Sequence, residues 1–194
     1  AAKKEKSRWG EKMPEYVFHV KWLASAFPRS HIVHIIRDPR DVAASVCRAG
    51  WKPSLVDAAL FWKKRVSAAR SAGQALEEDR YHEVRYESLV QNPAEELRSL
   101  SRRIDVQFDA EMTATHQSGM DAMPEAHRGL DHFTLLDRPI DSSRAYAWKR
   151  ELSRSEIADV EEMVAPLMRD LGYSVTGKTV PLWVQGARKS RAVG

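Results

Sequence analysis

Residues 31–50, HIVHIIRDPRDVAASVCRAG, decide how the rest of the chain is arranged. The first six residues are dominated by branched aliphatic side chains, which favours a strand buried on both faces, as in a parallel sheet covered by helices. Asp38 is suited to cap a helix, Pro39 to begin it and Gly50 to end it. The stretch therefore predicts a strand, a tight turn and a helix.

Arg37 lies at the junction of this strand and helix, and Ser45 lies two turns into the helix. Helix starts at the carboxyl end of a strand are where α/β sheets bind ligands and where free backbone N–H groups attract anions. A guanidinium group and a hydroxyl both donate hydrogen bonds to phosphate oxygens. The spacing leaves two interpretations open. Either Arg37 and Ser45 form a phosphate site, or Arg37 pairs with Asp41 and Ser45 is an ordinary helix residue.

The segment RDPRDVAASV (37–46) resembles the 3′-phosphate-binding segment of sulfotransferases that use 3′-phosphoadenosine-5′-phosphosulfate (PAPS) as sulfate donor. It is similar in particular to bacterial enzymes related to protein-tyrosine sulfotransferases. The resemblance implies that Arg37 and Ser45 bind the 3′-phosphate of the donor. It also implies an α/β fold of the P-loop-NTPase-like sulfotransferase type, with parallel strands flanked by helices, and transfer of a sulfuryl group to a hydroxyl of an acceptor.

Two other segments resemble the same family. WGEKMP (9–14) is similar to a segment in which a lysine beside a proline stabilises charge on the transferring group, which implies this role for Lys12. RYESLVQNPAEEL (85–97) is similar to a segment in which a tyrosine after a strand contacts the donor nucleotide, which implies that role for Tyr86. Spacing alone favours the plainer alternatives, a solvated loop lysine for Lys12 and a half-buried strand tyrosine for Tyr86.

The segment DHFTLLDRPIDSSRAYAW (131–148) fits the layout of a family loop that covers the donor. His132 occupies the position where related enzymes place a serine that helps to stabilise the transition state, so the residue type departs from the family. A histidine could still donate a hydrogen bond or handle a proton. Arg144 is the candidate second cation for the 3′-phosphate, or else a surface arginine.

The rest of the chain alternates helical and strand patterns. A helix is predicted over 14–27, and a long helix with a sustained apolar stripe begins after Ser54. A short strand is expected at 81–86, and further helices are expected after Asn92 and after Ser153. Ser153 and Glu156 have the spacing of a capping box. Residues 109–146 predict a short helix followed by an extended loop.

Composition sets outer limits on function. The chain has 194 residues, a net charge of +4 and a single cysteine. We expect one domain over residues 9–173, after a charged lead-in (1–8) and before a basic tail (174–194). The charge mildly favours anionic ligands and does not by itself indicate nucleic acid. One cysteine excludes an internal disulfide and favours a reducing, cytoplasmic location. There is no transmembrane run and no pattern of metal ligands.

The family places a glycine-containing loop for the 5′-phosphosulfate before the region matched here. We therefore expect the natural protein to be longer and this fragment to hold the nucleotide end of the site without the sulfuryl end, so that it need not be active alone. The acceptor is expected to be a small-molecule, carbohydrate or peptide hydroxyl, with PAPS as donor and no metal. Neither the resemblance nor the residues identify the base that deprotonates it.

Two other classes of function stay open. Residues 172–179, GYSVTGKT, match the P-loop pattern, which would make the chain a nucleotide kinase or NTPase using Lys178 and Thr179. That mechanism needs a strand before the loop and a helix after it, whereas a helix is predicted before it. The other class is a non-catalytic phosphate or nucleic-acid-binding module using the basic helix at 63–70 and the tail.

Overall fold

The computed structural model describes residues 8–77, 79–114 and 139–177. Two parallel strands, β1 (Ile32–Ile36) and β2 (Tyr81–Arg85), pair in register from Ile32 opposite Tyr81 to Ile36 opposite Arg85. Each strand leads into a helix, α2 (Pro39–Arg48) after β1 and α4 (Tyr86–Gln91) after β2. Because the strands are parallel, the two helices begin at the same edge of the sheet.

The helix after β1 forms as the sequence predicts. Asp38 caps α2, and its carboxylate accepts a hydrogen bond of 2.9 Å from the backbone N–H of Arg40. Pro39 is the first helical residue, where a missing N–H costs nothing. Beyond the helix, Gly50 takes a φ of 71°, a conformation that glycine adopts without strain. Residues 31–50 therefore form the predicted strand, turn and helix.

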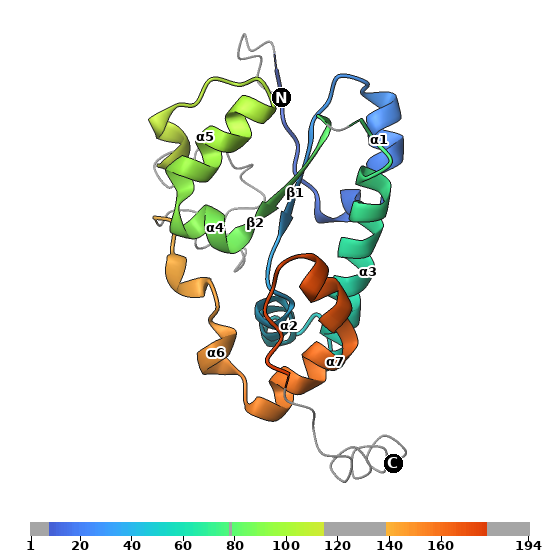
Figure 1. The fold of residues 1–194 in the computed structure, drawn as a ribbon, viewed down its shortest axis with the longest axis vertical. Helices are drawn as coiled ribbons and strands as arrows, with labels where there is room; N and C mark the ends of the chain where they lie inside the picture. Colours follow the sequence, from blue (N-terminus) through green and yellow to red (C-terminus); the bar gives the residue numbers. More distant parts are fainter. Residues whose placement is uncertain (1–7, 78, 115–138, 178–194) are drawn as a thin grey trace.

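The core lies where α2 meets two long helices, α3 (Leu55–Gly73) and α7 (Arg154–Asp170). The predicted apolar stripe of α3 is confirmed, because Ala59, Trp62, Val66 and Ala69 are all buried. Ser153 and Glu156 make the predicted capping box of α7. In Figure 1 the sheet lies between α3 on one side and α4 with α5 on the other. The predicted class, a parallel α/β fold flanked by helices, is confirmed.

Shorter elements complete the described chain. They are η1 (Pro14–Phe18), α1 (Val20–Ala26), α5 (Pro93–Arg103), η2 (Ala110–Thr113), η6 (Ser142–Arg144) and α6 (Trp148–Glu151). None of the helices in the described part of the chain is long and apolar enough to cross a membrane.

Three local predictions are wrong in detail. The helix expected over 14–27 is two pieces, η1 and α1, separated at His19, whose φ of −119° is not helical. Tyr86 begins a helix rather than ending a strand, and the stretch after it is helical. The strand β1 is not buried on both faces, because Val33 is 38% and Ile35 is 53% exposed. Ile36 is buried in the core, whereas the face of β1 that carries Val33 and Ile35 is only partly covered by the described residues.

Candidate functional site

The parallel pairing of β1 and β2 brings Arg37 and Tyr86 together, because each is the first residue after its strand. The guanidinium carbon of Arg37 lies 4.6 Å from the centre of the Tyr86 ring, within the range of a cation–π contact. Burial raises the pKa of the Tyr86 phenol, so the ring stays neutral at physiological pH. The neutral tyrosine ring therefore contacts the Arg37 guanidinium group without forming an ion pair with it.

The third residue of the site, Arg144, lies 107 residues after Arg37 in the chain. Nη2 of Arg37 donates a hydrogen bond of 2.7 Å to the backbone carbonyl oxygen of Arg144 in η6. The carboxylate of Asp41 lies 3.8 Å from the same nitrogen, so the pairing that the spacing left open is present, but it is long. Arg37 and Arg144, two of the predicted phosphate ligands, are therefore neighbours in the fold.

One atom of Arg37 has no partner among the described residues. Its Nε is buried and makes no hydrogen bond to any described residue. A buried N–H without an acceptor costs free energy, and most such groups in proteins are paired. An anion held by the guanidinium group would supply the missing acceptor. The Arg37 side chain therefore has one N–H group whose acceptor the described residues do not supply.

Ser45 and Arg48 extend the site along α2. Ser45 lies one turn beyond Asp41 on the same helix face, is exposed, and its hydroxyl makes no hydrogen bond within the described part of the chain. Arg48 forms an ion pair with Glu151, and the Arg144 guanidinium lies 4.0 Å from the same carboxylate. Arg37 before α2, Arg48 in α2 and Arg144 in η6 thus place guanidinium groups around the helix, together with the Ser45 hydroxyl, and such donors are suited to a phosphate ester.

A buried ionic network holds the start of α2 in place. Arg40 binds the carboxylate of Asp38 and that of Glu161 in α7, at 2.7 Å each. Glu87 accepts hydrogen bonds from the backbone N–H of Asp38 and from the Tyr173 hydroxyl, at 2.8 and 3.0 Å. The sequence interpretation missed this network, although the charged residues of the RDPRD motif were a signal for it. It fixes the strand-to-helix junction that carries Arg37.

The two predicted catalytic residues do not join this cluster. Lys12 is exposed in the extended chain before η1, and within the described residues no hydrogen bond or ion pair links it to the cluster. His132 lies outside the described residues. The structure therefore brings Arg37, Tyr86 and the Arg144 backbone together, and the binding and catalytic roles of all six predicted site residues stay predictions. Within the described residues no group of acidic, histidine or cysteine side chains could hold a metal ion.

The P-loop match does not have the structural context of a phosphate site. The helix α7 precedes Gly172, and residues 173–177 that follow are neither strand nor helix. Thr176 is instead tied to Glu161 by its backbone N–H and its hydroxyl, at 3.0 and 2.8 Å. Lys178 and Thr179 lie outside the described residues. The described residues before the loop form the helix α7 in place of the strand that this motif requires, which disfavours the kinase or NTPase interpretation.

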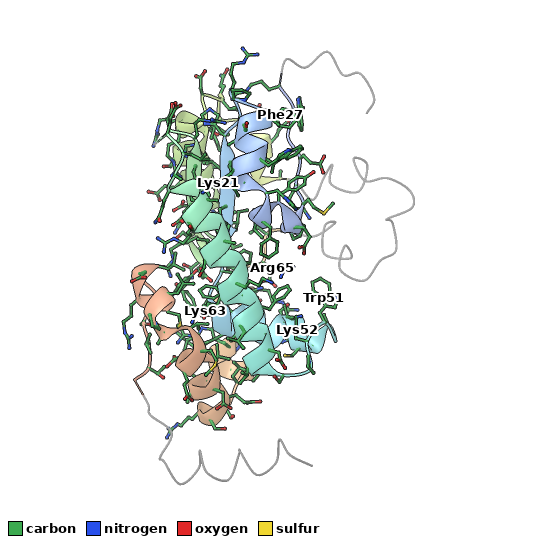
Figure 2. All side chains as sticks on the ribbon, turned by 90° about the vertical axis from the view of Figure 1, so that its right-hand side faces the viewer. Lys21, Phe27, Trp51, Lys52, Lys63 and Arg65 are labelled. Atoms are coloured by element: carbon green, nitrogen blue, oxygen red, sulfur yellow. The ribbon has the colours of Figure 1, made fainter. Side chains whose placement is uncertain are left out.

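The basic residues of α3 are engaged in the fold. Figure 2 looks onto this helix, with Lys63 and Arg65 labelled along it. Lys63 donates to the carbonyl oxygen of Met163 at 3.1 Å, and Arg65 pairs with Glu15 and stacks 3.7 Å from the Phe61 ring. These contacts disfavour the interpretation of the helix as a surface for polyanions.

Comparison with known proteins agrees with the geometry. A model described as the sulfotransferase family matches residues 1–110, more than half of the chain. A search of solved structures finds the sulfotransferase domain from the curacin biosynthetic pathway, with 22% identity, a TM-score of 0.64, and 85% of this chain covering 62% of that one. No curated protein matches the sequence.

Two further solved structures share the fold. The sulfotransferase domain from the Synechococcus PCC 7002 olefin synthase has 20% identity and a TM-score of 0.67, with 84% of this chain covering 58% of that one. Sulfotransferase STF9 from Mycobacterium avium has 18% identity and a TM-score of 0.54, with 88% of this chain covering 43% of that one. The chain thus spans less than two thirds of the length of the structures that it matches.

Proposed function

The chain belongs to the sulfotransferase family, and from this premise we propose that it transfers a sulfuryl group from PAPS to a hydroxyl group of an acceptor. Family and fold support sulfuryl transfer in general. The choice of donor is supported by the phosphate-type donor set at the strand edge. The choice of a hydroxyl acceptor rests on the family resemblance.

The observation that carries the proposal is the meeting of Arg37, Tyr86 and Arg144 at the carboxyl ends of two parallel strands. In this proposal Arg37, Arg144 and Ser45 bind the 3′-phosphate of the donor, and Tyr86 supports Arg37 or contacts the nucleotide. Hydrogen bonds to charged groups contribute about 1.5–3 kcal/mol each. One such contact corresponds to about a tenfold to hundredfold preference for a nucleotide that carries a 3′-phosphate.

In the proposed reaction the acceptor hydroxyl gives up its proton to a base or to water, and its oxygen forms a bond to sulfur while the bond from sulfur to the bridging oxygen of the donor breaks. The electron pair of that bond leaves with the 5′-phosphate of adenosine 3′,5′-bisphosphate, and negative charge develops on the bridging oxygen. Lys12 and His132 are the proposed groups that stabilise this charge, through electrostatics of the kind used in phosphoryl transfer. The binding residues hold the donor in line for attack.

The acceptor is proposed as a small molecule, a carbohydrate or a peptide that presents a hydroxyl. A transfer assay with donor carrying a radiolabelled sulfuryl group tests this against a panel of phenols, sugars and tyrosine or serine peptides. Sulfated product together with equimolar adenosine 3′,5′-bisphosphate supports the proposal. Hydrolysis of ATP by the same preparation, lost in Lys178→Ala and accompanied by no sulfuryl transfer, overturns it in favour of the P-loop interpretation.

A further inference from the structure

Tyr146, close to the proposed phosphate site, has an unusual backbone. Its φ is 58°, in the left-handed region that residues with a Cβ atom seldom adopt, and among non-glycine residues of the described chain only Asp105 shares this feature. Strained backbone of this kind persists only where surrounding contacts hold it, and it is concentrated at functional sites. Tyr146 is two residues after Arg144 in the chain.

The contact that holds this backbone is the carboxylate of Asp41. One oxygen accepts a hydrogen bond of 2.9 Å from the N–H of Tyr146, and the other accepts one of 2.8 Å from the N–H of Trp148. The Asp41 residue is only 3% exposed, and its partners lie more than 100 residues later in the chain. Both acceptor oxygens are thus committed to the segment Ser142–Trp148.

The same segment contains the carbonyl oxygen of Arg144, which accepts a hydrogen bond from Nη2 of Arg37. We propose that Asp41 is a positioning residue whose carboxylate holds the segment Ser142–Trp148 against α2, so that Arg37 and Arg144 face one phosphate group. The inference rests on the proposed function, because it concerns how the 3′-phosphate site is assembled. Asp41 itself does not contact the phosphate.

The chemistry of the side chain explains why an aspartate is needed. Two N–H groups point to one short side chain, and only a carboxylate offers an acceptor oxygen to each. An asparagine of the same shape has one oxygen and one NH₂ group, which would face an N–H donor. Asp41→Asn therefore frees one of the two backbone groups and releases one end of the segment.

Calorimetric titration with adenosine 3′,5′-bisphosphate and with 5′-AMP tests the proposal on the 194-residue chain. The readout is the ratio of the two affinities, which reports 3′-phosphate recognition alone. We expect Asp41→Asn to lower this ratio about tenfold, as for one lost charged contact. Val164→Ala, a cavity variant at a core residue that makes none of the site contacts described above, should lower the unfolding midpoint and leave the ratio unchanged.

An unchanged ratio in Asp41→Asn, with a wild-type chain that prefers the bisphosphate, overturns the positioning role and leaves the proposed function standing. A wild-type chain that binds the two nucleotides equally overturns the proposed function, and the positioning role with it. A ratio that falls equally in Val164→Ala also overturns the inference, because loss of stability then explains the effect.

A second variant covers the case in which Asp41→Asn folds poorly. Tyr146→Gly removes the cost of the left-handed backbone, so Asp41→Asn combined with Tyr146→Gly should recover part of the unfolding midpoint. The affinity ratio of the combined variant should stay low, because glycine does not hold Arg144 in place. Recovery of both the midpoint and the ratio contradicts the positioning role.

Discussion

Arg37 and Tyr86 occupy equivalent places on neighbouring strands, and the guanidinium carbon of Arg37 lies 4.6 Å from the centre of the Tyr86 ring. This contact exists because the strands are parallel and end at the same edge, so that the residues following them meet. The ring holds the guanidinium group in place without neutralising it. A cation supported in this way keeps its charge for a ligand.

Substitutions at Tyr86 separate the role of its ring from that of its hydroxyl. Tyr86→Leu should weaken binding of adenosine 3′,5′-bisphosphate about 2-fold to 30-fold, because a cation–π contact is worth about 0.5–2 kcal/mol. Tyr86→Phe keeps the ring and should bind as the wild type does. Calorimetric titration of both variants with the bisphosphate measures the two affinities. Equal losses in the two variants would show that the hydroxyl, not the ring, makes the contact.

The buried guanidinium of Arg40 should matter far more to stability than an exposed one. Its side chain is 1% exposed and pairs with two acidic residues, so Arg40→Ala leaves Asp38 and Glu161 buried without their partner. We expect a loss of about 3–5 kcal/mol in the free energy of unfolding, measured with urea. Arg48→Ala removes an ion pair whose arginine is 53% exposed and should cost less than about 1 kcal/mol. Similar losses in both would contradict the assignment.

Gly73 should resist a substitution that helix propensity favours. An added Cβ would overlap the ring of Tyr81, although alanine is worth about 1 kcal/mol more than glycine in a helix. We expect Gly73→Ala to destabilise the chain by about 1–3 kcal/mol, because α3 and β2 must move apart. Gly10→Ala, where the new Cβ meets open space, is the matched control. A gain of stability in Gly73→Ala would show that this packing is loose.

Acid should destabilise the fold through His34. Burial lowers the pKa of His34, and burial also lowers that of His82. Because the unfolded chain then binds protons at a higher pH than the folded chain, the free energy of unfolding should fall as pH drops from about 8 to about 5.5.

Urea denaturation at several pH values measures this slope. His34→Gln should flatten it, with the remainder due to His82, and His19→Gln, at an exposed position, should leave it unchanged. A slope that is the same in His34→Gln and in the wild type would exclude His34 as its source.

The features that the sequence predicted well are those set by neighbouring residues. Asp38 and Ser153 cap their helices as expected, because a cap depends only on the next three residues. The stripe of α3 is buried as its spacing requires. The start of α4 at Tyr86 was missed because neither a proline nor a capping side chain marks it.

Contacts between distant segments were the least predictable. The family resemblance named Arg37, Tyr86 and Arg144, and the parallel sheet explains why the first two meet. Nothing in the local sequence indicates that Asp41 would bind Tyr146 and Trp148, since 105 or more residues separate them. The ion pair of Arg40 with Glu161 could not be predicted for the same reason, because 121 residues separate the two. Such partners follow from topology, which the helical and strand patterns alone do not determine.

The central claim, a nucleotide site that recognises a 3′-phosphate through Arg37, is tested most directly by calorimetric titration of the chain with adenosine 3′,5′-bisphosphate and 5′-AMP. Wild type and Arg37→Ala are compared, with Arg169→Ala, an exposed arginine at the end of α7, as the matched control. We predict that the wild type and the control prefer the bisphosphate and that Arg37→Ala loses this preference by about tenfold to hundredfold. A preference that survives unchanged in Arg37→Ala would contradict the claim.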